Sequence, residues 1–230
     1  MSFTYDYPKA DHTVDAVVFG VDLEERDLKI LLIERGREGE PFFGHWALPG
    51  GFINIDEDLD DALERELEEE TGLRVSYIEQ LYTFGKPDRD PRGRVISTAY
   101  MALVRPTEVT GQDDAAKAEW KSVKDLPPLA FDHKDIVYTG LYRLRTKVRW
   151  KPIGINLLPH EFTLTELQQV YEIILDRKLD KRNFRRRVLR LGVLAETGET
   201  KSIGRRPPKL YRFDKDAYHR LHHTGFSFEV

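Results

Sequence analysis

The segment Gly51–Leu73, GFINIDEDLDDALERELEEETGL, determines how the first half of this chain folds. Ten carboxylates lie between Asp56 and Glu70, in a stretch that is expected to be helical from residue 57 to residue 71. With about 100° per residue, Glu66 and Glu70 fall on the apolar stripe of that helix, and Glu69 lies close beside them. The stripe itself consists of Leu59, Ala62, Leu63 and Leu67.

Carboxylates that face a protein core repel one another and lose hydration, so a cation is their natural partner. Hard oxygen ligands of this kind suit Mg²⁺ or Mn²⁺. An ordinary solvated acidic helix would carry its charges on the opposite, wet side, where Asp60, Asp61, Glu64 and Glu68 are found. The segment therefore predicts a divalent-metal site on one face of a helix.

The spacing within this segment resembles the Nudix box at every defined position. Gly51 is followed after five residues by Glu57, and Arg65 follows after seven more. The pattern then continues through Glu66, Leu67, Glu69, Glu70, Gly72 and Leu73. The preceding Leu48-Pro49-Gly50 is also usual in that family. The resemblance implies a strand, a glycine-rich loop and a helix that hold a divalent metal against a diphosphate.

The resemblance also implies roles for individual residues. Glu66, Glu69 and Glu70 match the metal-carrying positions, and the metal would neutralise the diphosphate and help to deprotonate a water. Arg65 would orient the glutamates by ion pairing, and Glu57 would support the loop. The implied reaction is hydrolysis of a nucleoside diphosphate linked to another group, although the same site can serve for ligand sensing without turnover.

Substrate contacts are expected from arginines outside the box and from its first glycines. Arg35, Arg37, Arg89 and Arg92 are candidates for the diphosphate or ribose, because guanidinium groups match phosphate oxygens. Each of them alone is more often a solvated surface charge. Gly50 and Gly51 complete the predicted substrate-binding set.

Composition limits the class of protein. Forty per cent of the 230 residues are apolar and 11% are aromatic, which is enough for well-packed cores. The absence of cysteine excludes disulfides, thiolate metal sites and cysteine nucleophiles. The polar N-terminal residues lack an apolar signal core, and no stretch approaches a membrane span, so a cytoplasmic location is expected.

Charge divides the chain into two parts. Residues 1–150 carry 20 basic and 30 acidic side chains, whereas residues 151–230 carry 16 and 10. The net charges are therefore −10 and +6, which indicates two domains with different partners. Residues 1–150 are expected to form a Nudix α/β/α sandwich with a mixed sheet, and segment 149–160 is expected to be a linker.

The second part has the pattern of a winged helix-turn-helix domain. Thr163 and Glu166 form a capping box before one helix, and Asp180 caps a second helix that ends at Gly192. Two short strands then enclose a loop with basic residues. The alternative is a small helical module whose basic face is solvated and which mediates dimerisation.

A winged helix places its second helix in the DNA major groove, where cationic side chains contact phosphates and bases. The wing can reach a neighbouring groove or the backbone. The predicted DNA contacts are Lys181, Arg182, Arg185, Arg186 and Arg190 on the helix, and Arg205 and Arg206 on the wing.

The two parts together resemble the Nudix-related transcriptional regulators. That group includes repressors of NAD metabolism that respond to ADP-ribose, and relatives that control sugar utilisation. The resemblance implies a homodimer, a double-stranded DNA operator and an ADP-ribose-like or sugar effector. Three functions stay open: a regulator with retained hydrolysis, a plain Mg²⁺-dependent pyrophosphatase with a structural C-terminal module, and a non-catalytic sugar-responsive repressor.

Overall fold

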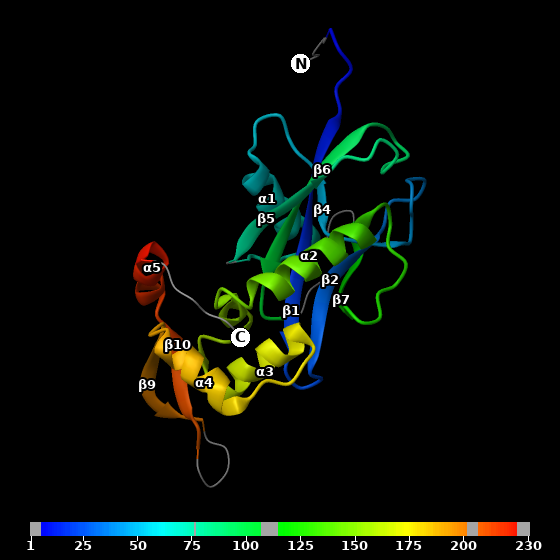
Figure 1. Ribbon diagram of the computed structural model, residues 1–230. Coiled ribbons are helices and arrows are strands. Elements are labelled where there is room, and N and C mark those ends of the chain that lie inside the picture. The colour runs from blue at the N-terminus through cyan, green and yellow to red at the C-terminus, as the bar shows by residue number, and fades with distance from the viewer. Residues whose placement is uncertain (1–5, 76, 107–114, 202–206, 225–230) are drawn as a thin grey trace. The chain divides into compact units, whose positions relative to one another are not determined.

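The computed structural model describes residues 6–75, 77–106, 115–201 and 207–224, which form two compact units (Figure 1). The first unit contains residues 1–19 and 29–141, and the second contains residues 20–28 and 142–230. Arg205 and Arg206, two of the predicted DNA contacts, lie outside the described residues. No helix in the described ranges combines the length and the apolar character that crossing a membrane requires.

The first unit is built on a mixed sheet in which the strand order is β3-β2-β1-β6-β5, with β4 pairing with β1 and β7 pairing with β2. The central strand β1 runs parallel to β6 and antiparallel to β4. The strands are β1 (Asp11–Asp22), β2 (Asp27–Arg35), β3 (Trp46–Ala47), β4 (Gly50–Phe52), β5 (Ile78–Phe84), β6 (Val95–Leu103) and β7 (Ala115–Ser122).

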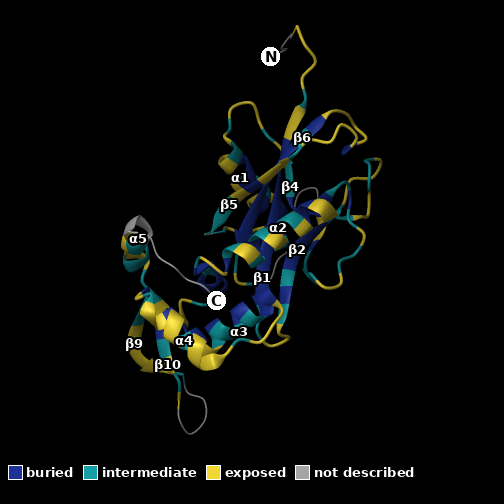
Figure 2. Cartoon of the chain, viewed as in Figure 1, coloured by how far each residue is buried: buried dark blue, intermediate teal, exposed yellow. Residues whose placement is uncertain are grey.

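Two helices cover the two faces of this sheet. Side chains alternate along β1, so neighbouring residues of this strand pack against different helices. Val14 packs in one cluster with Leu63 and Leu67 of α1 (Leu59–Thr71). Val17, on the other face, lies against Gly140 of α2 (His133–Lys147). The arrangement confirms the predicted α/β/α sandwich, and the buried strands are dark blue in Figure 2.

Helix α1 begins two residues later than the sequence predicts. Asp58 is its N-cap and accepts a hydrogen bond from the Leu59 amide, so Glu57 precedes the helix instead of opening it. Gly72 ends the helix in the left-handed conformation, with φ of 70°. The predicted orientation is confirmed for Leu63, Leu67 and Glu70, which are all buried.

The second unit contains the predicted winged helix. Helices α3 (Leu164–Leu175) and α4 (Lys181–Arg190) are followed by a three-stranded antiparallel sheet in the order β8-β10-β9. The remaining elements are η1 (Ile153–Leu157), β8 (Glu161–Phe162), β9 (Leu194–Thr200), β10 (Lys209–Phe213) and α5 (Lys215–Thr224). Thr163 forms the predicted capping box with Glu166, and Asp180 caps α4 by accepting from the Asn183 amide.

The segment expected to be a linker is largely buried. Ile153, Ile155 and Leu157 belong to the 3₁₀ helix η1, and each is less than 9% exposed. Gly154 lies so close to the Tyr171 ring that a Cβ there would be 2.9 Å from it. Pro152 and Gly154 therefore shape a turn that packs on α3. Ile153 and Ile155 supply apolar surface that an open linker would expose.

Candidate functional site

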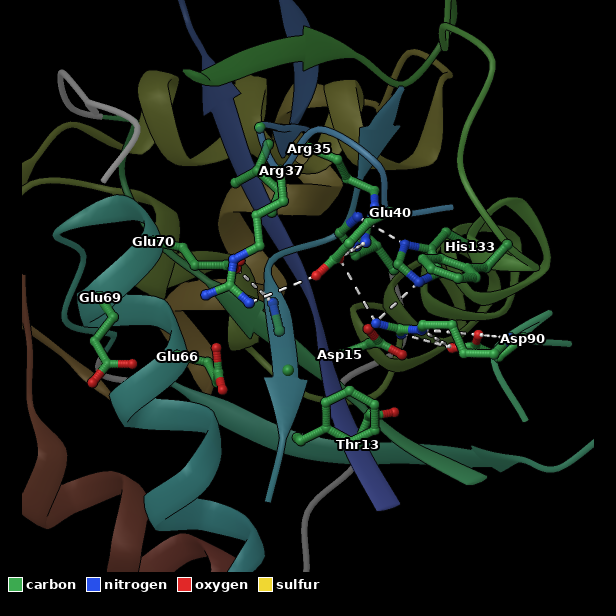
Figure 3. A pocket seen from close by; sticks show the side chains of 18 of the residues that line it. Thr13, Asp15, Arg35, Arg37, Glu40, Glu66, Glu69, Glu70, Asp90 and His133 are labelled. Carbon is green, nitrogen blue, oxygen red and sulfur yellow. Dashed lines mark hydrogen bonds and ion pairs between the residues drawn. The ribbon is translucent and has the colours of Figure 1, made fainter. Parts of the chain in front are cut away.

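A pocket of about 330 Å³ opens in the first unit between α1, β4 and the loops that follow β2 and β5 (Figure 3). It is lined on one side by the carboxylates of α1 and on the other by arginines. The predicted residues among its lining are Arg35, Arg37, Gly50, Gly51, Arg65, Glu66, Glu69, Glu70, Arg89 and Arg92. The fold thus gathers nearly the whole predicted site from four separate stretches of sequence.

The two glycines of β4 permit the backbone to approach its neighbours closely. The Gly50 amide donates to Glu70 Oε2 at 2.8 Å, which holds this buried carboxylate at the end of α1. A Cβ on Gly50 would lie 2.1 Å from the Val14 carbonyl oxygen, and one on Gly51 would lie 2.4 Å from Glu66 Oε1. Side chains at these positions would therefore disturb the strand or the acidic helix.

Arg65 holds three carboxylates of the box. Its guanidinium donates to both oxygens of Glu57, at 2.9 and 2.6 Å, to Glu66 at 2.7 Å and to Glu69 at 3.1 Å. It also donates to the Phe52 carbonyl at 3.1 Å, which attaches the helix to β4. The geometry matches the orienting role that the sequence predicts for Arg65.

These contacts shift the pKa values of the carboxylates in opposite directions. Hydrogen bonds from Arg65 and from the Asn54 amide lower the pKa of Glu57 to about 2. Burial raises the pKa of Glu66 and outweighs the opposing effect of Arg65. Glu66 is therefore a carboxylate in a poorly hydrated place, where an additional positive charge would stabilise its ionised form.

The donor set fits a hard divalent cation in chemistry. In the described parts of the chain, however, no three His, Asp or Glu side chains already surround a common point as metal ligands do. The contacts explain why, because Arg65 engages Glu66 and Glu69 while the Gly50 amide engages Glu70. Metal binding would require these carboxylates to reorient toward a common point.

The arginines on the opposite side meet at one carboxylate. Arg35 donates to Glu40 Oε2 at 2.8 Å, and Arg37 and Arg92 form ion pairs with Glu40 at 3.6 and 3.9 Å. Arg92 also donates to Asp90 through two nitrogens. Burial by itself would raise the pKa of Asp90, but the hydrogen bonds from Arg92 outweigh it and lower this pKa.

Arg89 is placed differently from the other predicted substrate arginines. Its side chain is only 3% exposed and donates to both oxygens of Asp132, at 3.1 and 2.7 Å. Asp15 lies 3.5 Å from Arg89 Nη2 and accepts a short hydrogen bond from Ser97 Oγ. The guanidinium of Arg89 thus already pairs with the buried Asp15 and the partly buried Asp132, which makes it a support of the pocket floor.

His133 belongs to the same buried group. Its Nδ1 accepts from the Leu48 amide at 2.9 Å, and its Nε2 is 3.5 Å from Asp15 Oδ1. Burial lowers the pKa of His133, so the neutral ring with the proton on Nε2 fits both contacts. The histidine at the start of α2 thereby positions the strand that carries Gly50.

Sequence reasoning missed several lining residues. Asp15 lies on β1, Phe131 lies in the loop before α2 and His133 begins α2, and no motif marks any of them. Phe131 lies 5.0 Å from the Arg35 guanidinium and 5.5 Å from that of Arg92. Its positive φ of 50° is visible only in the folded backbone.

The basic helix of the second unit presents most of its predicted DNA contacts to solvent. Lys181, Arg182, Arg186 and Arg190 are exposed, while Phe184 and Val188 are buried on the opposite stripe (Figure 2). Arg185 differs, because it is only partly exposed and donates to Thr165 Oγ1 of α3 at 2.9 Å. One of its nitrogens, Nε, is buried without a hydrogen-bond partner. Arg185 therefore also connects the two helices.

The first unit is a Nudix-type sandwich whose box carboxylates and arginines enclose a pocket, and the second unit is a winged helix. A NUDIX domain family model matches residues 11–139, and a model of the NrtR DNA-binding winged helix domain matches residues 154–213. The chain therefore belongs to the Nudix family, in the group that carries this winged helix.

Relatives support both halves. The chain is 41% identical over 218 residues to the ADPR responsive transcriptional repressor NtrR of Acinetobacter baylyi, which covers 93% of this chain and 86% of that protein. It is 43% identical over 127 residues to the ADP-ribose pyrophosphatase of Methanocaldococcus jannaschii, which covers 55% of this chain and 70% of that protein.

Solved structures of Shewanella oneidensis NrtR are also similar. The complex of that protein with a 27mer DNA has a TM-score of 0.79 and 35% identity, covering 90% of this chain and 95% of that one. Its NUDIX domain complexed with ADP ribose has a TM-score of 0.56 and 37% identity, covering 61% of this chain and 94% of that one.

Proposed function

We propose that the chain is a transcriptional regulator that binds ADP-ribose in the pocket of its first unit and double-stranded DNA through its winged helix. The observation that carries this proposal is the presence, in one chain, of a complete box pocket and a helix α4 with five exposed or partly exposed predicted DNA contacts. The relatives named for a response to ADPR and for binding DNA carry the same two domains along most of their length.

The pocket has the chemistry that a nucleoside diphosphate sugar needs. Arg35, Arg37 and Arg92 offer guanidinium groups for phosphate oxygens. Phe52 and Phe131 offer ring faces, each close to the guanidinium of Arg92. The predicted metal ligands Glu66, Glu69 and Glu70 lie on the α1 side of the pocket, away from Arg35, and Arg37 reaches toward Glu70 (Figure 3). A bound Mg²⁺ or Mn²⁺ would supply positive charge to the diphosphate and acidify a water.

Helix α4 has the arrangement required for contact with DNA. Its apolar stripe is occupied by packing on α3, with the Phe184 ring 5.2 Å from that of Tyr171. Its exposed surface is consequently dominated by cations, which supply the sequence-independent part of DNA affinity. The predicted contacts of the helix are Lys181, Arg182, Arg185, Arg186 and Arg190, and those of the wing are Arg205 and Arg206.

Hydrolysis of ADP-ribose is the second candidate function, and the intact box favours it. Every box residue is present, and the hydrogen bonds from Arg65 to Glu57, Glu66 and Glu69 support the orienting role that the resemblance implies. In that case Glu66, Glu69 and Glu70 would hold the metal, and the chain would be both enzyme and regulator.

One experiment separates these functions. The protein is incubated with ADP-ribose and Mg²⁺, AMP and ribose 5-phosphate are followed by chromatography, and binding of labelled DNA from the upstream region of its own gene is measured by fluorescence anisotropy with and without ADP-ribose. DNA binding that changes with ADP-ribose supports the regulator. Product that disappears in Glu66→Gln adds the enzyme. Absence of DNA binding at low salt would refute the regulator.

The oligomeric state is part of the same proposal. A homodimer would present two copies of α4 to the two halves of a palindromic operator. Light scattering on the purified protein, free and bound to DNA, measures the mass directly. A monomer in both states would contradict the dimer.

A further inference from the structure

Glu40, a residue of the loop between β2 and β3, is surrounded by the arginines of the pocket. Its carboxylate lies 2.8 Å from Arg35 Nη2, 3.6 Å from Arg37 Nη1 and 3.9 Å from Arg92 Nη1. Dashed lines from Glu40 mark these interactions in Figure 3. Three arginines, one from the end of β2 and two from separate loops, thus share one acidic partner.

We propose that Glu40 occupies the anion subsite of the pocket and that a ligand phosphate must displace it to bind. Guanidinium groups bind carboxylate and phosphate oxygens through the same donors, so one acceptor can replace the other. The inference rests on the proposed function, because it assigns the diphosphate of the ligand to this cluster of arginines. It adds a residue that sets affinity and that belongs to no box position.

Charge and exposure favour exchange at this position. The Glu40 side chain is 33% exposed, and those of Arg35 and Arg92 are 18% and 33% exposed, so the cluster lies at the rim of the pocket. A rim carboxylate can rotate into solvent without leaving a buried charge unpaired. Asp15 and Asp132, by contrast, both pair with Arg89, and Asp15 also accepts a hydrogen bond from Ser97.

The exchange has a consequence for selectivity. A ligand with a single negative charge replaces Glu40 on equal terms and gains little from the arginines. A diphosphate brings a second charge and additional acceptor oxygens, so it gains after Glu40 has moved. Glu40 therefore favours diphosphates over singly charged anions by competing with both.

The loop supplies a matched control. Glu38 is two residues away, is exposed, and is not among the residues that line the pocket. Glu38→Gln changes the net charge of the loop by the same amount as Glu40→Gln. Any difference between the two variants consequently reports the position of the carboxylate.

Isothermal titration of wild-type protein, Glu40→Gln and Glu38→Gln with ADP-ribose, inorganic pyrophosphate and inorganic phosphate tests the proposal. Glu40→Gln is expected to bind ADP-ribose and pyrophosphate about five- to tenfold more tightly than wild type, and to gain at least as much for phosphate. Glu38→Gln is expected to stay within about twofold. Circular dichroism verifies folding, and Glu40→Ala serves as the second variant.

The three ligands distinguish failure of this inference from failure of the proposed function. Tighter pyrophosphate binding by Glu40→Gln, with no ADP-ribose binding by any variant, would uphold the anion subsite and refute ADP-ribose as its ligand. If Glu40→Gln and Glu40→Ala bind ADP-ribose and pyrophosphate no more tightly than wild type does, Glu40 organises the arginines for these ligands. That result would overturn the proposal. Pyrophosphate that binds none of the proteins would overturn it as well.

Discussion

Gly50→Ala is expected to damage the fold of the first unit, because the added Cβ would collide with backbone. The Cβ would lie 2.1 Å from the Val14 carbonyl oxygen and 2.9 Å from the Asp15 Cα. Both atoms belong to β1, the central strand, which is paired with β4 and β6. No side-chain rotation can relieve such a contact, so β4 itself must move.

Two terms set the magnitude. Gly50 has φ of 147°, a region that costs a residue with a Cβ about 1–3 kcal/mol. Overlap with well-packed atoms costs about 1–3 kcal/mol more. The loss in the free energy of unfolding is therefore about 2–6 kcal/mol, which lowers Tm by roughly 5–25 °C for a domain of this size.

Gly51→Ala is the matched comparison. Its added Cβ would lie 2.4–2.7 Å from the carboxylate of Glu66, the far end of a side chain that can rotate. Its expected effect on Tm is small, but Glu66 loses its place beside Arg65, so Mg²⁺-dependent ADP-ribose binding weakens. Differential scanning fluorimetry and titration measure the two effects. Equal Tm values for wild type and Gly50→Ala, or equal losses in both variants, would refute this reasoning.

Three further predictions concern charge, DNA and the core. The pKa of Glu57 is about 2 in the folded protein, below its ordinary value of 4.5, so its stabilising contribution is present above pH 4.5 and is lost as pH falls through about 2. Urea unfolding should show the difference between wild type and Glu57→Gln shrinking over this window, and a constant difference would exclude the assignment. Arg186→Ala should reduce the slope of DNA affinity against salt concentration, on logarithmic scales, by about 0.9 at unchanged Tm. Arg185→Ala should reduce this slope and also lower Tm, because Arg185 donates to Thr165 of α3. An unchanged slope in both variants would remove α4 from the DNA interface. Phe184→Ala should cost about 3–5 kcal/mol in urea unfolding, since this ring is 2% exposed, and a loss below 1 kcal/mol would contradict its place in the core.

The sequence predicts local structure where neighbouring residues cooperate. The periodicity of Leu63 and Leu67 places Glu70 on the buried side of α1, and the structure confirms it. The capping box of Thr163 and Glu166 is likewise a contact between residues three apart. Such features depend on helix geometry alone, which is the same in every fold.

The linker shows where local patterns fail. Two prolines and a glycine between residues 149 and 160 indicate a linker, yet Ile153 and Ile155 are buried. The Tyr171 ring on α3 decides the outcome, because Gly154 packs directly against it. No pattern within the segment contains that information, because Tyr171 lies seventeen residues further along the chain.

The chemical identity of the box was determined by the sequence, since Glu57, Arg65 and Glu66 meet through a helix and the loop before it. Only the tertiary structure decided how the pocket arginines are used. Arg89 pairs with the partly buried Asp132, while Arg92 lies at the rim with Glu40. The two arginines are three residues apart on one loop. They differ because Asp15 of β1 and Asp132, which immediately precedes α2, pair with Arg89, whereas the Arg92 side chain is partly exposed to solvent.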